Sequence, residues 1–176
     1  MKVYLIGFMG SGKTYVGKRL AQLLDYLFID TDSLIENTEG VTVAQLFETR
    51  GETAFRKIES ERLQGLSKWD NVIVATGGGA PCFHDNMTVI NKAGITVYLK
   101  TNPHLLRQRL ACETEHRPVL GGRKDAELLA FIEERVEARE VFYEQADIII
   151  YQESNEQDIA QDILKEIYER AQTASN

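Results

Sequence analysis

The segment from Gly7 to Thr14 constrains the fold of this chain most strongly. It reads G-F-M-G-S-G-K-T and matches the pattern G-x-x-x-x-G-K-[ST] at every position. An apolar run precedes it at Val3–Ile6, and a helical pattern follows it from Thr14 to Leu24. Between a strand and a helix, the backbone N–H groups of such a loop curl around a phosphate chain. The motif predicts a phosphate-binding loop; a helix N-terminus that carries Gly and Lys by chance is the alternative.

The last residues of the motif have distinct roles. Lys13 places a positive charge beside a transferred phosphate, and the Thr14 hydroxyl can ligate Mg²⁺. We expect the nucleotide to contact a continuous run: Gly10, Ser11, Gly12, Lys13, Thr14 and Tyr15.

Composition excludes several classes of protein. The chain has 176 residues, which suits one domain with a sizeable core. Its formal net charge of −7 argues against a nucleic-acid partner. Because a nucleoside triphosphate is also anionic, the cations are expected to gather at the site.

Compartment is inferred from what the chain contains. No run is long and apolar enough to cross a membrane, and the first strand candidate begins within three residues of Met1. We therefore expect no signal peptide, no membrane partner and a cytoplasmic protein. Cys82 and Cys112 lack metal-ligand spacing; reduced thiols are the simpler interpretation, and a disulfide between them is the alternative.

Short apolar runs alternate with helical patterns, which is typical of an α/β fold. The strand candidates are continuous apolar runs, as in a parallel sheet covered by helices on both faces. They are Lys2–Ile6, Leu27–Asp30, Val72–Ala75, Thr96–Leu99 and Asp147–Tyr151. The helical patterns are Lys13–Leu24, Val43–Arg50, Glu52–Lys68, Asp85–Lys92, Pro103–Leu110, Ala126–Gln145 and Glu156–Gln172. In such sheets ligands bind at the carboxyl ends of the strands.

Two carboxylates end the second strand candidate. Asp30 and Asp32 are two residues apart, so in an extended segment they point the same way. Beside Mg²⁺ and an incoming hydroxyl, one can hold a metal-bound water and the other can orient or deprotonate the acceptor. The alternative is structural, because Thr31 or Asp32 could cap a helix through Ser33–Asn37.

Three consecutive glycines follow the third strand candidate. Gly77, Gly78 and Gly79 each cost backbone entropy on folding, which is reasonable where the backbone must approach a ligand and present N–H groups. A flexible loop is the alternative.

Arginines on two helical patterns are candidates for binding an anionic substrate. Arg56 lies three residues before Glu59, and Arg139 lies four residues before Tyr143. A guanidinium is the natural fork for a carboxylate. Ordinary surface ion pairs are the alternative for both arginines.

The polar stretch Glu113–Lys124 has the composition of a closing lid. It contains Arg117 and the pair Gly121-Gly122. An arginine on a lid can neutralise charge on the phosphates in the transition state, which would make Arg117 catalytic. A solvated charged loop is the alternative.

Taken in order, these motifs resemble those of the shikimate kinase family, in the nucleoside monophosphate kinase-like group of P-loop proteins. The resemblance covers essentially the whole chain. It implies a three-layer P-loop NTPase fold whose five-stranded parallel sheet has strand order 2-3-1-4-5. It implies ATP-dependent phosphorylation of the shikimate 3-hydroxyl, with Mg²⁺, by a monomer. One domain would span residues 1–172, with a substrate-binding segment at about 31–60, a lid at about 112–124 and a polar tail at 173–176.

The resemblance also implies roles for individual residues. Asp32 would bind the hydroxyls of shikimate and act in catalysis with Lys13 and Arg117. The carboxylate would be held by Arg56 and Arg139, near Gly77, Gly78 and Gly79, with Phe47 and Phe55 as an apolar wall. Thr14 would hold Mg²⁺, and Asp30 would assist through a water molecule. Arg109 is the nearest match to an arginine that packs on adenine, although its spacing from Arg117 is about one residue longer than the family pattern.

Two other functions remain open from the sequence. The same fold can phosphorylate another acceptor, such as gluconate or a nucleoside monophosphate, but the pair Arg56 and Arg139 favours a compact carboxylate. The other alternative is a non-catalytic regulator that binds ATP. The carboxylates of Asp30 and Asp32 and the three consecutive glycines argue against it, because ATP binding alone needs neither.

Overall fold

Residues 1–111, 120, 123 and 125–173 are described by the computed structural model. In this part of the chain five strands form one sheet: β1 (Lys2–Ile6), β2 (Leu27–Asp30), β3 (Val72–Ala75), β4 (Ile95–Thr101) and β5 (Ile148–Gln152). Every pair of neighbours is parallel, and the order is β2-β3-β1-β4-β5. The predicted fold class and strand order are confirmed. The first three predicted strands agree with the structure at both ends, and the last two differ by one or two residues.

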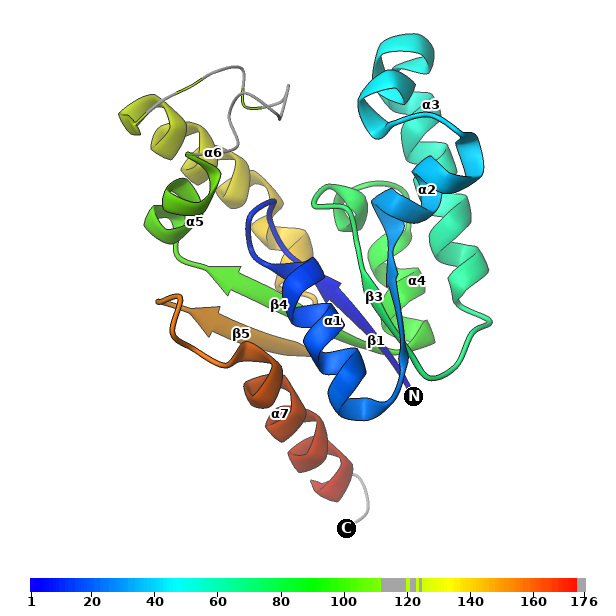
Figure 1. Cartoon of the computed structure of the whole chain (residues 1–176), viewed down its shortest axis with the longest axis vertical. Coiled ribbons are helices and arrows are strands. Elements are labelled where there is room, and N and C mark those ends of the chain that lie inside the picture. The colour runs from blue at the N-terminus through cyan, green and yellow to red at the C-terminus, as the bar shows by residue number, and fades with distance from the viewer. Residues whose placement is uncertain (112–119, 121–122, 124, 174–176) are drawn as a thin grey trace.

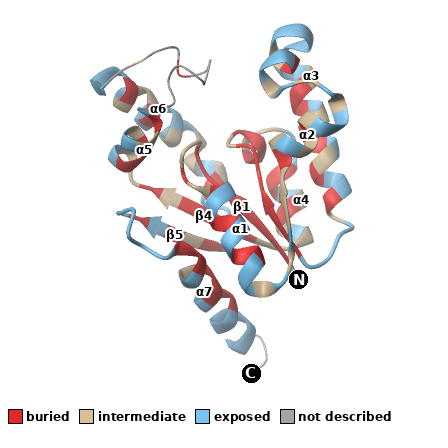
Figure 2. Ribbon diagram, viewed as in Figure 1, coloured by how far each residue is buried: buried red, intermediate tan, exposed pale blue. Residues whose placement is uncertain are grey.

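Helices cover both faces of the sheet (Figure 1). On one face, α1 (Lys13–Leu24) and α7 (Ile159–Thr173) pack against alternate residues of the strands, such as Val3 and Leu5. On the other face, α3 (Val43–Leu66), α4 (Asn86–Ala93) and the end of α6 (Asp125–Tyr143) pack against Tyr4 and Ile6. Figure 2 shows the resulting buried layers, with exposed residues on the outer sides of the helices.

Two smaller helical units flank the carboxyl ends of the strands. The helix α5 (Pro103–Leu110) packs on α6 around Phe8, which follows β1. The helix α2 (Thr31–Glu39) packs on α3 through Ile35, Leu46 and Phe55. Figure 1 shows these units on either side of the loop that follows β1. The ligand-binding edge of the sheet is therefore bordered by α2 and α3 on one side and by α5 and α6 on the other.

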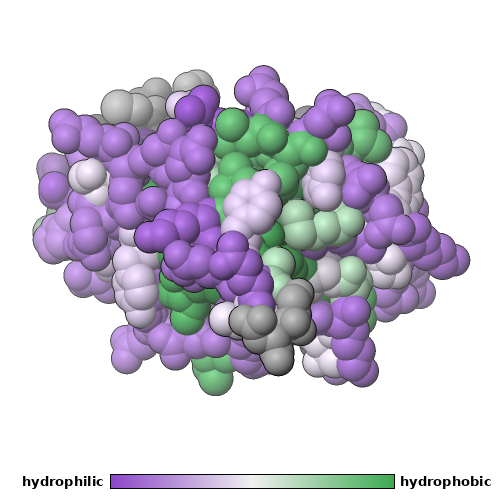
Figure 3. Space-filling view, turned by 90° about the horizontal axis from the view of Figure 1, so that it is seen from below, coloured by the Kyte–Doolittle hydropathy of each residue, from purple (hydrophilic) through white to green (hydrophobic). Residues whose placement is uncertain are grey.

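The surface is mainly polar. Figure 3 shows one face on which apolar side chains gather in the centre and hydrophilic side chains surround them. Among the described residues, no helix has both the length and the apolar character that crossing a bilayer requires.

The long helix α3 contains a break at Gly51. Its φ of 77° and ψ of 168° belong to a region that only glycine adopts at low cost. The predicted division into two helices at this residue is confirmed, although the second section ends at Leu66 rather than Lys68. Thr42 starts the first section with a capping box to Gln45.

The backbone at Gly51 can be tested with Gly51→Ala. No atom lies within 4 Å of an added Cβ, so the cost comes from the backbone conformation alone. We expect the substitution to lower the free energy of unfolding by about 1–2 kcal/mol in urea denaturation. Gly65→Ala is the matched control, because Gly65 lies in the same helix with open space around it; alanine there should stabilise by about 0.5–1 kcal/mol. Equal effects of the two substitutions would contradict a strained break.

Candidate active site

The phosphate-binding loop lies between β1 and α1, as the motif predicts. Gly12 precedes α1 with a φ of 87°, a left-handed conformation that leaves the helix N-terminus open toward a ligand. Lys13 is buried, and its Nζ donates hydrogen bonds to the carbonyl oxygens of Gly7 and Phe8, each at 2.9 Å. The ammonium group is therefore held inside the loop, at the place where a phosphate chain would need it.

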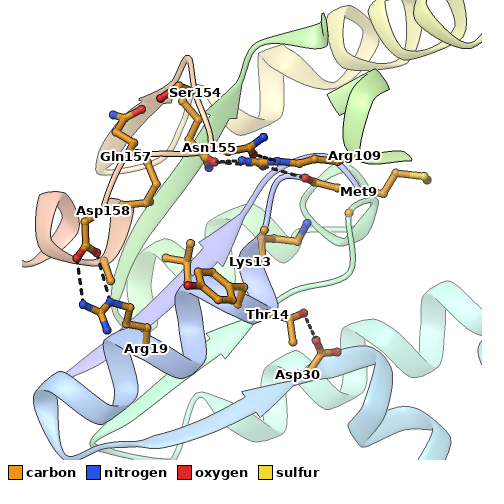
Figure 4. Close-up of a pocket in the computed structure, with 18 of the residues that line it drawn as sticks. Met9, Lys13, Thr14, Arg19, Asp30, Arg109, Ser154, Asn155, Gln157 and Asp158 are labelled. Carbon is orange, nitrogen blue, oxygen red and sulfur yellow. Dashed lines mark hydrogen bonds and ion pairs between the residues drawn. The ribbon is translucent and has the colours of Figure 1, made fainter. Parts of the chain in front are cut away.

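A cavity of about 1010 Å³ opens beside this loop (Figure 4). It brings together residues from four strand ends, although they are far apart in the sequence. Those predicted from the sequence are Gly10, Gly12, Lys13, Thr14, Tyr15, Asp30, Asp32, Gly78 and Arg109. The segment Ser154–Ala160, which follows β5, also lines the cavity and was not foreseen, because its residues carry no recognisable motif.

Arg109 connects the phosphate-binding loop to the segment after β5. Its Nε donates to Asn155 Oδ1 at 3.0 Å, and its Nη1 donates to the carbonyl oxygen of Gly10 at 3.1 Å. Both terminal nitrogens also lie 3.3 Å from Gln152 Oε1. Arg109 also lines the nucleotide-sized cavity, and its contact with adenine stays a prediction.

A second arginine, Arg19, lines the same cavity. Arg19 on α1 pairs with Asp158, just before α7, with Nη2 and Oδ2 3.1 Å apart (Figure 4). Nearly half of each side chain remains exposed, so the pair contributes little to stability. It does connect the middle of α1 to the start of α7.

Asp30 ends β2 and makes two kinds of contact. One oxygen, Oδ1, accepts hydrogen bonds from the backbone N–H groups of Asp32 and Ser33, and thereby caps α2. The other, Oδ2, accepts the Thr14 hydroxyl at 2.7 Å. The alternative in which Thr31 or Asp32 caps this helix is wrong, because the helix begins at Thr31, earlier than expected. The cap fixes Asp30 while leaving an oxygen for Thr14.

Asp32 and Glu59 bring two carboxylates together at Gly77. A Cβ on Gly77 would lie 2.9 Å from Asp32 Oδ1 and 2.6 Å from Glu59 Oε1. Burial, together with the neighbouring Asp30 carboxylate, raises the pKa of Asp32, and the charge of Lys13 opposes this rise. Burial also raises the pKa of Glu59, against the charge of Arg56. Of these two carboxylates, only Asp32 lines the cavity.

The glycine turn 77–79 provides space for neighbouring side chains. A Cβ on Gly79 would lie 2.7 Å from Arg56 Nη2, just as one on Gly77 would meet the two carboxylates. The N–H of Gly77 is already used, because it donates to Thr31 Oγ1 at 2.9 Å. The expectation of free N–H groups is therefore wrong for Gly77, and it stays a prediction for Gly78 and Gly79.

Arg56 projects from α3 toward this turn. Its side chain is only 10% exposed, and its Nη1 donates to Glu59 Oε2 at 2.8 Å. The alternative predicted for Arg56 is a surface ion pair. The ion pair with Glu59 is present, but it is buried and does not lie on the surface. The rings of Phe47 and Phe55 lie 4.5 Å apart and within 5.6 Å of the guanidinium.

A third aromatic ring lies near Arg56, and no sequence pattern indicates it. The centre of Phe83 lies 4.1 Å from the guanidinium carbon, closer than that of either predicted ring. Phe83 follows η1 (Ala80–Cys82), a short helix that no periodic pattern marks. Phe55 is 2% exposed, so its ring packs beside the Arg56 guanidinium and does not form an open wall.

Arg139 approaches the same turn from α6. Its Nη1 donates to the carbonyl oxygen of Gly78 at 3.4 Å, and its guanidinium lies 5.5 Å from the centre of the Phe8 ring. The Tyr143 hydroxyl donates to the same carbonyl oxygen. Tyr143 is fully buried, and its hydroxyl connects α6 to the turn.

Some sequence predictions fall elsewhere. Arg117 and most of the predicted lid lie outside the described residues. Within that segment Leu120 is buried on α5 and α6, and the Arg123 guanidinium lies over the Phe131 ring.

Cys82 is a free thiol, and its burial raises its pKa to about 11.

Comparison with known proteins identifies the family. The family model described as shikimate kinase matches residues 9–169. A shikimate kinase from Parabacteroides distasonis is 46% identical over 169 residues, covering 93% of this chain and 98% of that protein. A crystal structure of shikimate kinase from Bacteroides thetaiotaomicron is 41% identical with a TM-score of 0.88, covering 96% of this chain and 98% of that one.

A shikimate kinase from Acinetobacter baumannii, solved in complex with shikimate, is 36% identical with a TM-score of 0.86, and the match covers 96% of this chain and 93% of that one. Sequence and structure agree over nearly the whole chain, so the protein belongs to the shikimate kinase family.

Proposed function

We propose that this protein transfers the γ-phosphoryl group of ATP to the 3-hydroxyl of shikimate, giving shikimate 3-phosphate and ADP. Membership of the shikimate kinase family supports a kinase that acts on an alcohol group. This reaction belongs to the biosynthesis of chorismate and the aromatic amino acids.

One observation carries the choice of acceptor: two guanidinium groups reach the glycine turn 77–79 from opposite sides. Arg56 comes from α3 and faces Gly79, and Arg139 comes from α6 and bonds to Gly78. Gly78 and Asp32 also line the nucleotide-sized cavity. A small acceptor held there would place its carboxylate on the arginines and its hydroxyl beside Asp32.

The residues near the loop suit a magnesium nucleotide. Mg²⁺ prefers oxygen ligands and is usually bound by one or two protein groups together with phosphates and water. Thr14 Oγ1 and Asp30 Oδ2 supply such oxygens, 2.7 Å apart at the cavity. Within the described residues no cluster of three or more His, Cys, Asp or Glu side chains would hold a metal without the nucleotide. Bound there, Mg²⁺ would neutralise charge on the phosphates.

The protein groups act mainly by position and charge. Lys13 would exchange its loop carbonyl partners for phosphate oxygens and stabilise the charge that develops during transfer. Asp32 would accept a hydrogen bond from the attacking hydroxyl and orient it toward the γ-phosphate. Arg117, Tyr15 and Arg109 would contact the nucleotide, Arg117 from the lid. Phe47 and Phe55 would shape the acceptor site through Arg56.

The remaining expectations form part of this proposal. The protein would work as a cytoplasmic monomer, with residues 1–172 as one kinase domain, residues 31–60 as the acceptor-binding segment and residues 112–124 as the lid. A purely regulatory ATP site would leave the convergence of Arg56 and Arg139 on one turn without a purpose, whereas gluconate, which also carries a carboxylate, is distinguished from shikimate by the assay with competing acceptors.

The proposed activity has a direct test. Purified protein with MgATP and shikimate should release ADP in a coupled assay, and the product should be shikimate 3-phosphate by mass spectrometry. Gluconate and nucleoside monophosphates serve as competing acceptors in parallel reactions. Folded protein that shows no shikimate-dependent release of ADP would refute the proposal.

The role of Arg139 is tested against a neighbour on the same helix. Arg139→Ala removes one of two cations from the acceptor carboxylate, so the KM for shikimate should rise about 10- to 100-fold. The KM for ATP should change less than about twofold. Arg135→Ala is the control, because Arg135 is exposed, lies one turn earlier and stacks only on Phe131 within the described residues. Similar kinetics for the two variants would contradict the assignment.

The raised pKa of Asp32 predicts that this residue costs stability. A raised pKa means that the folded protein binds the proton more tightly than the unfolded chain, so ionised Asp32 destabilises the fold at neutral and alkaline pH. Asp32→Asn should therefore raise Tm at pH 8 by about 2–4 °C, which corresponds to about 1 kcal/mol. The difference should shrink as pH falls through the raised pKa. Turnover should fall about 10²- to 10⁴-fold.

The control for this measurement is Asp70→Asn. Asp70 is exposed, and the described residues make no hydrogen bond or ion pair with its side chain. Its Tm should match that of the parent from pH 5 to pH 8 in differential scanning calorimetry. A Tm at pH 8 that is lower in Asp32→Asn than in the parent would contradict the prediction.

A further inference from the structure

The donor groups of Arg56 are already engaged without a ligand. Its Nη1 donates to Glu59, as described above. Its Nε and Nη2 both donate to a single oxygen, Glu52 Oε1, at 3.2 and 3.1 Å. The Nε–Nη2 edge is one of the two-pronged edges with which a guanidinium binds a carboxylate. A carboxylate of the protein therefore occupies a fork that the proposed acceptor requires.

The two carboxylates on Arg56 differ in their access to water. The Glu59 side chain is 1% exposed, and its Oε1 has no hydrogen-bond partner among the described residues. Glu59 is thus a fixed counter-ion, because it cannot leave without a buried charge losing its partner. The Glu52 side chain is 56% exposed. Release of Glu52 into water costs little, as for other exposed ion pairs.

The position of Nη2 shows which side of Arg56 an acceptor would meet. The same nitrogen that contacts Glu52 would lie 2.7 Å from a Cβ on Gly79. The neighbouring Gly78 lines the cavity and also accepts the Arg139 hydrogen bond. An anion that arrives between the glycine turn and Arg139 therefore reaches the edge of Arg56 that Glu52 holds.

We propose that Glu52 is a stand-in for the acceptor carboxylate: it holds the Nε–Nη2 edge of Arg56 in the empty site and is displaced when the acceptor binds. This inference rests on the proposed function. Glu52 is a positioning residue, since it acts on the acceptor only through Arg56. It keeps the guanidinium oriented between the three phenylalanine rings, and its competition weakens acceptor binding. The same competition discourages other small anions from occupying the fork.

The test is Glu52→Gln, which keeps the shape and a hydrogen-bond acceptor but removes the competing charge. The KM for shikimate and the Kd from isothermal titration should both fall about two- to fivefold, while kcat changes by less than about a factor of two. Glu61→Gln is the matched control: Glu61 is exposed on the same helix, and no described residue bonds to it. It removes the same charge without touching Arg56 and should leave both constants unchanged.

A neutral acceptor separates competition from a general change in charge. For the shikimate analogue whose carboxylate is reduced to a primary alcohol, Glu52→Gln should give no gain in affinity. An unchanged or raised KM for shikimate in Glu52→Gln overturns the inference, because it would make Glu52 neutral or purely supportive. An equal gain in Glu61→Gln or with the alcohol also overturns it. Parent protein that fails to phosphorylate shikimate refutes the proposed function itself, and this inference with it.

Discussion

The acceptor side of the site depends on the absence of side chains at residues 77–79. Asp32 and Glu59 occupy the space beside Gly77, and Arg56 occupies the space beside Gly79. On the other side, the carbonyl oxygen of Gly78 receives Arg139 and Tyr143. Because β3 lies next to β1 in the sheet, this turn stands beside the phosphate-binding loop, and a Cβ on Gly78 would lie 3.2 Å from the Met9 nitrogen. The turn thus sets the separation between the acceptor groups and the phosphate groups.

Charge in the site is balanced locally, which explains how an acidic protein can bind anions. The chain carries a net charge of −7, yet Lys13, Arg56 and Arg139 are among the cations that the described residues bring to the ligand-binding edge of the sheet. Lys13 donates hydrogen bonds to carbonyl oxygens of the loop, and Arg56 forms ion pairs with two carboxylates. Arg139 donates a hydrogen bond to a carbonyl oxygen and lies near an aromatic ring. The buried carboxylate of Glu59 keeps Arg56 in place. Burial of carboxylates costs stability, and the raised pKa values of Asp32 and Glu59 reflect that cost.

Much of this arrangement could be predicted from sequence because local patterns determine it. The helix Lys13–Leu24 and the first three strands follow directly from the loop motif and from uninterrupted apolar runs. The residue that caps α2 could not be predicted, because Asp30, Thr31 and Asp32 are all good capping residues. A shift of one residue in the start of the helix changes which of them is the cap.

Contacts that depend on packing were also beyond the sequence. That Glu52 shares Arg56 with Glu59 depends on where α3 is broken and which way each section faces. The ring of Phe83 and the segment after β5 reach the site from elements without a periodic signal. Residue types can indicate the chemistry of a site, but they do not show which of several possible partners a side chain contacts in the folded protein.

The core that joins α2 to both sections of α3 has a mechanical consequence. Ile35 comes from α2, Leu46 from the section of α3 before Gly51, and Phe55 from the section after it. The break is therefore bridged by common packing, which holds α2 and the two sections of α3 together as one unit. The section that carries Arg56 also continues to Leu63 and Leu66, which pack against the sheet with Tyr4 and Val72. The spacing between the Asp32 carboxylate and the Arg56 guanidinium is therefore set by the hydrophobic core to which both helices belong.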